Sequence, residues 1–243
     1  MAQNKKMAIS TNPLAWLRSV QPRRAIALLL LLLPLTVGAQ TVRDLWLSMP
    51  PSLAPYLSTS LRTQCLDFYD MHTDAQTDNA LKGKSRIDTL TSTFLAATLS
   101  KAHTLQMKLL PASGSASGLG SSLGSGSSSS LSSCDSVLCV VRSWDGPKRD
   151  SEVQLFDRQW KPLQAPFTFS ADSFVCRPDT MSEERFSRLV ALLDPIMFSV
   201  SLSPAENVLL VKLSPVVPNP EDEKAIEQIL VQRKLKWDGK TFK

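Results

Sequence analysis

The chain is poor in the residues that most often carry catalysis or hold a metal. Its 243 residues include two histidines and four cysteines, and no two cysteines have the C-x-x-C spacing of a zinc ribbon or a thioredoxin-type site. H-E-x-x-H, P-loop and G-x-G-x-x-G motifs are absent as well. These absences disfavour zinc proteases, nucleotide-binding enzymes and dinucleotide-dependent enzymes. The sequence therefore predicts no cofactor and leaves the question of an enzyme open, with the balance against one.

Net charge is also missing from most of the chain. The formal net charge is +5, but residues 1–39 hold five of the 27 basic residues and no acidic residue. The remaining part is balanced, with 22 basic and 22 acidic residues. A nucleic-acid binder needs a strongly basic surface, so this balance predicts no nucleic-acid partner.

The excess positive charge lies in a segment with the layout of a secretory signal peptide. Arg23 and Arg24 precede an apolar run over residues 25–37, and small residues lead to Ala39. We expect Sec-type export with cleavage after Ala39, a periplasmic or secreted location, and membrane contact only through the leader before cleavage. The alternative is a retained anchor, although a spanning helix needs about 20 apolar residues.

Four cysteines follow the leader, and an even number in an exported protein permits disulfides. The candidates are Cys65, Cys134, Cys139 and Cys176, which allow three complete pairings. A strand is predicted around Cys139, and five extended residues at about 3.3 Å each would place Cys134 about 16 Å away, beyond the reach of a bridge. The other interpretation of Cys139 is a buried thiol that packs as a small apolar residue.

Apolar spacing predicts helices first and then strands. Over residues 42–69 apolar side chains recur every three or four positions, and prolines beside Met49 predict short helices instead of one rod. Short alternating segments rich in threonine follow, which is typical of half-buried strands. We expect an antiparallel meander with a turn at Asp145-Gly146-Pro147. Its strands are residues 86–90, 93–99, 104–110, 137–141 and 153–156.

The C-terminal part repeats the order of helix and strands. Thr180 and Glu183 match a capping box for one helix. Asn219 caps a second helix, whose other end would carry Arg233 and Lys234. The pattern predicts an α+β fold, an antiparallel β-sheet meander with helices packed on one side; two helix-then-strands subdomains are the alternative arrangement. A hairpin is expected between the two helices, over residues 197–202 and 208–213.

A serine- and glycine-rich segment at residues 113–133 interrupts the predicted strands. It cannot bury enough apolar surface to offset its ordering entropy, so we expect it to be disordered. Its serines have no neighbouring base, which argues against a serine nucleophile there. We interpret it as an insert at a hairpin tip within a single domain over residues 40–243. The alternatives are a domain boundary at the insert or a subdomain boundary near residues 165–180.

A series of short motifs, each present once, extends through the first two thirds of the chain. They are 46–57 (WLSMPPSLAPYL), 67–70 (DFYD), 83–85 (GKS), 139–142 (CVVR), 146–147 (GP) with 150–151 (DS), and 156–163 (FDRQWKPL). This series resembles an uncharacterised exported family of Bacteroidetes that is labelled domain of unknown function 3256. Relative to that family, the serine- and glycine-rich segment resembles an insertion into a hairpin. The resemblance implies a periplasmic or cell-surface setting and no particular reaction.

Asp70, His72 and Asp74 form the tightest cluster of potential metal ligands. In an extended segment this spacing would place all three side chains on one side, where a metal could be held. The competing interpretation is a solvated acidic loop, since His103 is the one other histidine available to complete a site. Cys65 lies near His72 in the sequence, but a cysteine nucleophile needs a base and a setting that stabilises the thiolate.

Three tryptophans beside charged residues, Trp144, Trp160 and Trp237, are candidates for a binding surface. For at least two of them we favour a position in the core. Two function classes remain. The preferred one is a non-enzymatic periplasmic binding or interaction module that presents a sheet face or edge to an envelope protein or cell-surface component. The alternative is a metal-dependent hydrolase that uses the aspartate and histidine cluster.

Overall fold

The computed structural model describes residues 40–113, 136–164 and 167–243. The predicted leader, residues 114–133 of the predicted insert, and Cys134 lie outside the described residues. Gln40–Lys243 forms one compact unit. Within the described ranges, no helix has the length and apolar content that crossing a membrane requires.

Two helices open the described chain, separated as the prolines predict. α2 (Val42–Ser48) begins with a capping box at Thr41. α3 (Thr59–Asp70) begins at Ser58, whose hydroxyl accepts a hydrogen bond from the first turn of the helix. α2 stops before Met49 because two prolines follow that residue, and proline neither donates a helical hydrogen bond nor tolerates a helical residue before it.

Seven strands form an antiparallel sheet in the order of the sequence, so the predicted meander is confirmed. β4 and β5, which flank the serine- and glycine-rich segment, are neighbours in it, with Leu110 opposite Val137. β1 and β7 were not predicted, because two residues are too few to show a period of two. The strands are β1 Thr77–Asp78, β2 Lys84–Leu90, β3 Phe94–Ser100, β4 His103–Pro111, β5 Ser136–Asp145, β6 Arg149–Phe156 and β7 Pro162–Leu163.

The C-terminal part builds a second antiparallel sheet of three strands in the order β10-β9-β8. The predicted hairpin is confirmed as β8 and β9, and the α+β class of the fold is confirmed with it. A 3₁₀ helix and α4 precede this sheet, and α5 connects β9 to β10. The elements are η2 Ala171–Phe174, α4 Glu183–Ala191, β8 Phe198–Leu202, β9 Val208–Leu213, α5 Pro220–Glu227 and β10 Arg233–Lys236.

The start of α4 differs from the prediction. The cap is Ser182, whose hydroxyl accepts a hydrogen bond from the Arg185 N–H, and not Thr180. Starting two residues later places Glu183 and Glu184 in the first turn, beside the positive end of the helix dipole. The prediction recognised the right composition and put the cap in the wrong register.

The end of α5 also differs from the prediction. The Asn219 cap is confirmed, but the helix ends at Glu227. Arg233 and Lys234 belong to β10, where they pair with β9. Tertiary pairing with β9 therefore decides the conformation of this basic segment, which sequence alone assigned to the end of a helix.

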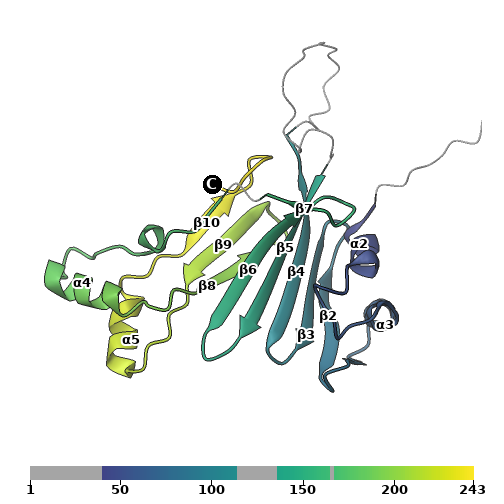
Figure 1. Ribbon diagram of the computed structural model, residues 1–243, viewed down its shortest axis with the longest axis horizontal. Helices are drawn as coiled ribbons and strands as arrows, with labels where there is room; N and C mark the ends of the chain where they lie inside the picture. The colour runs from purple at the N-terminus through teal and green to yellow at the C-terminus, as the bar shows by residue number, and fades with distance from the viewer. Residues whose placement is uncertain (1–39, 114–135, 165–166) are drawn as a thin grey trace, which may run out of the picture. The chain divides into compact units, whose positions relative to one another are not determined.

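The seven-stranded sheet has an apolar core on each face, and different elements cover the two faces (Figure 1). Alternate residues of β5 point to opposite faces, as a strand requires. Leu138 and Val140 join the core under α2 and α3. Val137, Cys139 and Val141 join the core under the second sheet, η2, α4 and α5.

The edge strand β8 crosses β4, β5 and β6, and side chains of the large sheet bind its outer edge. Because β9 pairs with one edge of β8, the N–H groups on the other edge need partners elsewhere. Three polar side chains supply them. Phe198, Val200 and Leu202 donate their N–H groups to Asp150 Oδ1, Ser151 Oγ and Gln106 Oε1, at 3.3, 3.1 and 2.7 Å.

A buried lysine of β4 donates hydrogen bonds to the loop that joins β8 to β9. Lys108 is 2% exposed, and its Nζ donates to the carbonyls of Ser203, Pro204 and Glu206 at 2.6, 2.9 and 2.8 Å. Burial lowers the pKa of this ammonium group, and the Glu206 carboxylate acts in the opposite sense. The charge of Lys108 thus holds three loop carbonyls against the large sheet.

Candidate functional site

One corner of the second sheet lacks a strand. β10 pairs with β9 only as far as Arg233, which lies opposite Val211. N-terminal to that point the chain turns away, and the Val231 N–H donates to the Phe174 carbonyl at 2.8 Å. β9 itself continues to Leu213. The last residues of β9, Lys212 and Leu213, therefore have no β10 residue paired with them.

The hydrogen bonds of β9 show which way its last residue faces. The Ser214 N–H donates to the Met197 carbonyl at 2.9 Å, on the β8 side. Successive residues in an antiparallel strand direct their main-chain groups to opposite edges. The N–H and C=O of Leu213 are therefore directed away from β8, into the corner that β10 has left.

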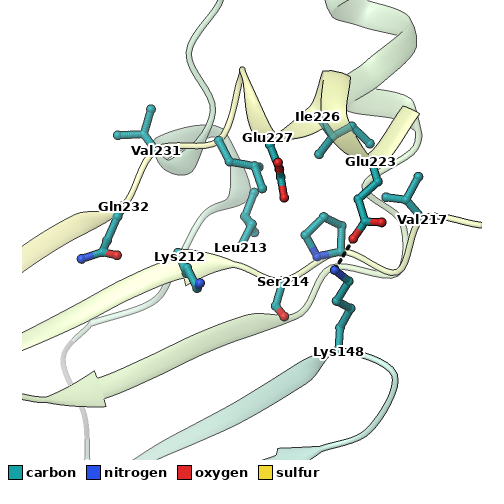
Figure 2. Close-up of a pocket in the computed structure, with 12 residues that line it drawn as sticks. Lys148, Lys212, Leu213, Ser214, Val217, Glu223, Ile226, Glu227, Val231 and Gln232 are labelled. Carbon is teal, nitrogen blue, oxygen red and sulfur yellow. Dashed lines mark hydrogen bonds and ion pairs between the residues drawn. The ribbon is translucent and has the colours of Figure 1, made fainter. Parts of the chain in front are cut away.

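Helix α5 closes this corner and leaves a cavity of about 310 Å³, which we call the α5 cavity (Figure 2). The volume lies at the lower end of the range typical of ligand sites. Its apolar lining comes from β9, the segment after it, α5 and the segment that leads from α5 to β10. These lining residues are Leu213, Pro215, Val217, Ile226, Leu230 and Val231.

Charged side chains line the same cavity from two sides. Glu223 and Glu227 stand four residues apart on α5, so one helix face carries both, and Figure 2 shows their carboxylates directed toward the β9 side. Lys148, in the turn between β5 and β6, forms an ion pair with Glu223. That pair relieves the repulsion that two like charges at this spacing produce.

Two further side chains of opposite charge line the α5 cavity without such an ion pair among the described residues. Lys212 extends from β9, and Glu227 extends from α5 one turn after Glu223. Neither makes an ion pair or a side-chain hydrogen bond with another described residue. Within the part of the chain that the structure describes, the α5 cavity thus combines an apolar lining, one unpaired cation, one unpaired anion and main-chain groups of Leu213 for which no hydrogen-bond partner is seen.

The predicted metal ligands do not gather in the structure. Asp70 is the last residue of α3, and its carboxylate pairs with Arg43 of α2. His72 and Asp74 line a different cavity, of about 430 Å³, between α3 and β2. Across the described ranges, no three potential ligands are grouped closely enough to hold a metal.

The backbone around His72 explains this separation. The Thr73 N–H donates to the Phe68 carbonyl at 3.2 Å, and the His72 N–H donates to the Tyr69 carbonyl at 3.0 Å. This is a Schellman motif, which closes a helix with a residue in the left-handed region, and His72 occupies that position at φ 52°. The segment is therefore a helix end, not the extended chain that would have placed three side chains on one side.

The three described cysteines are free thiols in different surroundings. Cys65 and Cys139 are buried on opposite faces of the large sheet, and Cys176 is exposed. Burial raises the pKa of both buried thiols, and for Cys65 a hydrogen bond with Thr77 acts in the opposite sense. A raised pKa disfavours the thiolate, so Cys65 and Cys139 lack the electrostatic setting of a cysteine nucleophile.

His103 lies in a cluster of aromatic and charged side chains on the helical face of the sheet. A hydrogen bond joins its Nδ1 to the Tyr56 hydroxyl, and its ring stacks on Trp144 with 5.2 Å between centroids. The Arg142 guanidinium lies 5.3 Å from the Trp144 ring and pairs with Glu152 at 2.6 Å. Burial lowers the pKa of His103, and the charge of Arg142 lowers it further.

The tryptophans singled out in the sequence have different environments. Trp160 is buried, and its Nε1 donates to Ser48 Oγ at 3.2 Å, so it closes the core beneath α2. Trp237 is partly buried and packs on Phe242. Trp144 is 39% exposed. Core positions therefore account for Trp160 fully and for Trp237 in part.

No residue of the α5 cavity was a candidate site residue in the sequence. The cap of α5 was predicted, and so was the end of the β8–β9 hairpin. These two elements form two walls of the cavity. The approach of Lys148 to Glu223, 75 residues away in the chain, depends on how the two sheets pack. Sequence periodicity carries no signal for that distance.

The fold and the cavity define an α+β protein with two packed antiparallel sheets and a charged, partly apolar cavity at a free strand edge. The family model described as "Protein of unknown function (DUF3256)" matches residues 34–119 and 129–242, and the chain belongs to this family. The unmatched residues 120–128 lie inside the serine- and glycine-rich segment. The predicted family membership is confirmed.

A solved structure has a similar fold. It is a domain of an uncharacterized protein from Porphyromonas gingivalis W83, with a TM-score of 0.61 and 22% sequence identity over 83% of this chain and 98% of that one. At this identity the likeness concerns the fold alone. A search of curated proteins gave no match.

Proposed function

We propose that the protein is a non-enzymatic binding module of the cell envelope and that its partner binds at the α5 cavity. One observation carries this proposal: an apolar lining, two unpaired opposite charges and a free strand edge converge in one cavity. Such a combination of an apolar surface with a few placed polar groups is typical of ligand sites. The partner we expect is an envelope protein or a cell-surface component.

The chemistry around the α5 cavity favours binding over catalysis. Ser214 is its one lining residue of a type that serves as a hydroxyl nucleophile, and no histidine lines the cavity. An activated serine needs a base in hydrogen-bond contact. Among the described residues, neither Glu223, which pairs with Lys148, nor Glu227 is hydrogen-bonded to Ser214. The groups present can position a ligand through hydrogen bonds, charge and apolar contact.

The envelope location is part of the proposal and has its own test. The basic, apolar and small-residue segments of residues 18–40 support export with cleavage after Ala39. We expect intact mass and N-terminal sequencing of protein from a periplasmic fraction to give a chain that starts at Gln40. A full-length mass in that fraction, or a product that resists carbonate extraction from membranes, would contradict this location.

Partner capture from the native envelope tests the site. The wild-type protein and the double variant Lys212→Glu, Glu227→Lys serve as baits at increasing concentration. The double variant keeps the net charge and reverses both unpaired charges of the α5 cavity. Lys101→Glu, at an exposed turn between β3 and β4, is the control for a surface charge change. We expect one saturable partner that the wild type and the control retain and the double variant loses.

Two results would overturn the proposal. Equal capture by the double variant would separate binding from the α5 cavity. Stoichiometric metal in the purified protein that is lost in His72→Ala would favour the metal-dependent hydrolase instead. Metal analysis of both proteins therefore accompanies the capture experiment.

A further inference from the structure

We infer that the ligand of the α5 cavity is an extended peptide segment that pairs with β9 at Leu213 and places one apolar side chain against Val217 and Leu230. This inference rests on the proposed function and names the class of ligand for the same site. The segment would lie where β10 would run if it continued along β9 past Arg233. Adding a strand to a free edge is a recurring mode of peptide recognition.

The main chain of β9 supplies the first part of the argument. Leu213 is 3% exposed as a residue, yet its N–H and C=O are directed to the side where the ladder has stopped. Buried main-chain groups almost always have hydrogen-bond partners. An extended peptide brings one donor and one acceptor at the spacing of a β ladder, which small rigid molecules seldom offer.

The lining supplies the second part. Val217 and Leu230 line the cavity beside Leu213 and are partly exposed, and the buried Ile226 lies among the same lining residues. Side chains of an extended peptide alternate between its two faces. One side chain can therefore pack on Val217 and Leu230 while its neighbours on either side point away from them, toward the charged rim.

The charges supply the third part and exclude other ligand classes. Lys212 and Glu227 leave the rim with one unpaired charge of each sign. A polyanion such as a nucleic acid would meet Glu223 and Glu227, and a polycation would meet Lys148 and Lys212. A peptide with an acidic and a basic residue on either side of an apolar one complements both signs.

Fluorescence polarisation with labelled peptides tests this inference directly. The three probes are acetylated, amidated pentapeptides with the central sequences Glu-Val-Lys, Glu-Val-Glu and Lys-Val-Lys. For the wild type we expect Glu-Val-Lys to bind a few-fold more tightly than the other two, since exposed ion pairs contribute modestly to binding. This expectation holds for the direction that places the glutamate of the probe beside Lys212 and its lysine beside Glu227.

Single charge reversals should change the ranking in opposite ways. Glu227→Lys makes the unpaired rim charges both positive, so Glu-Val-Glu should become the best probe. Lys212→Glu makes them both negative, so Lys-Val-Lys should become the best probe. Lys101→Glu, which does not line the cavity, should keep the wild-type ranking. A general loss of folding would lower all three affinities together and would leave no such exchange of rank.

The main-chain contact has a separate readout. A fourth probe carries an N-methyl group on the central valine of Glu-Val-Lys, which removes one N–H and leaves the side chains unchanged. We expect binding to weaken by about tenfold, since one hydrogen bond is lost and the methyl group also obstructs the strand edge. Undiminished binding of this probe would overturn the strand pairing.

The outcomes separate this inference from the proposed function. If no probe binds at millimolar concentration but the charge-reversed double variant loses its envelope partner, the site stands and the peptide ligand is wrong. If peptide ranking follows the rim charges and N-methylation weakens binding, the inference is supported. If sedimentation shows a dimer that the double variant abolishes and no probe binds, a second copy of the chain occupies the cavity and the inference is wrong.

Discussion

The two faces of the large sheet are covered by different kinds of structure, and β4 allows a direct comparison because it faces both. Leu105 and Met107 point to the helical face and are fully buried among apolar side chains. Gln106 and Lys108, their neighbours in the strand, point to the face that the second sheet covers. There they bind the main chain of β8 and of the loop after it.

The difference follows from what each covering element brings to the interface. A helix has already paired its main-chain groups except at its ends, so α2 and α3 can cover a sheet with apolar side chains alone. An edge strand arrives with a row of unpaired N–H groups, and those groups must be satisfied when they are buried. Polar side chains on the large sheet are therefore a requirement for docking β8, not a sign of a solvated face.

The largest expected effect is on the helical side. Met107→Ala removes a fully buried side chain from a core in which few polar groups are at stake. We expect the free energy of unfolding to fall by about 3 kcal/mol, from lost burial and the cavity left behind. Denaturant unfolding measures the change, with Lys101→Ala as a surface control. A loss below about 1 kcal/mol would mean that the helical face repacks freely.

Lys108→Met tests the other face of the same strand. The substitution keeps the length of the side chain and removes the ammonium group, so three loop carbonyls lose their common donor. We expect a loss of about 2 kcal/mol, below that of Met107→Ala because the loop carbonyls regain water on one side. Lys101→Met is the matched control. A variant as stable as the wild type would show that this face is held by apolar contact alone.

Sequence patterns predict much of the fold, because they report on local requirements. The cap at Asn219 was predicted and is confirmed, since a helix start needs a side-chain acceptor within a few residues. The alternation of β4 was visible too. What alternation cannot reveal is that Lys108 points into a protein interface, since a polar residue facing a second sheet and one facing water look the same in a single sequence.

The candidate site was harder to predict from the sequence, because it depends on contacts between distant segments. Asp70, His72 and Asp74 were candidates because of their spacing, yet a helix end at His72 separates Asp70 from the other two, which line one cavity. The α5 cavity forms where β10 leaves β9 near Arg233, and that departure reflects a hydrogen bond from Val231 to a distant segment. Composition and period describe an element, and they do not describe where a partner strand stops.

A smaller effect is expected where a single N–H of β8 loses its acceptor. Ser151→Ala leaves the Val200 N–H, in a residue that is 1% exposed, without the oxygen that it donates to. We expect the free energy of unfolding to fall by about 1 kcal/mol. Ser173→Ala, at an exposed hydroxyl, is the control. A change no larger than that of the control would argue that water replaces the serine and that β8 is less tightly docked than Lys108 and Gln106 indicate.

The smallest expected effect concerns pH and the polar cluster around His103 on the helical face. Burial and the charge of Arg142 lower the pKa of His103, so the folded protein favours the neutral ring, which also keeps its hydrogen bond with Tyr56. The unfolded chain takes up a proton near the ordinary histidine pKa of about 6.5. As the pH falls below that value the unfolded state therefore binds more protons than the folded state, and stability decreases.

His103→Gln removes this contribution, whereas all other titrating groups are shared with the wild type. The unfolding free energies of wild type and His103→Gln are measured from pH 7.5 to pH 5. As the pH falls, the wild type should lose stability relative to the variant. A difference between the two that stays constant over this range would show that His103 titrates alike in both states, and a wild type that gains stability relative to the variant would mean that the folded protein holds the protonated ring.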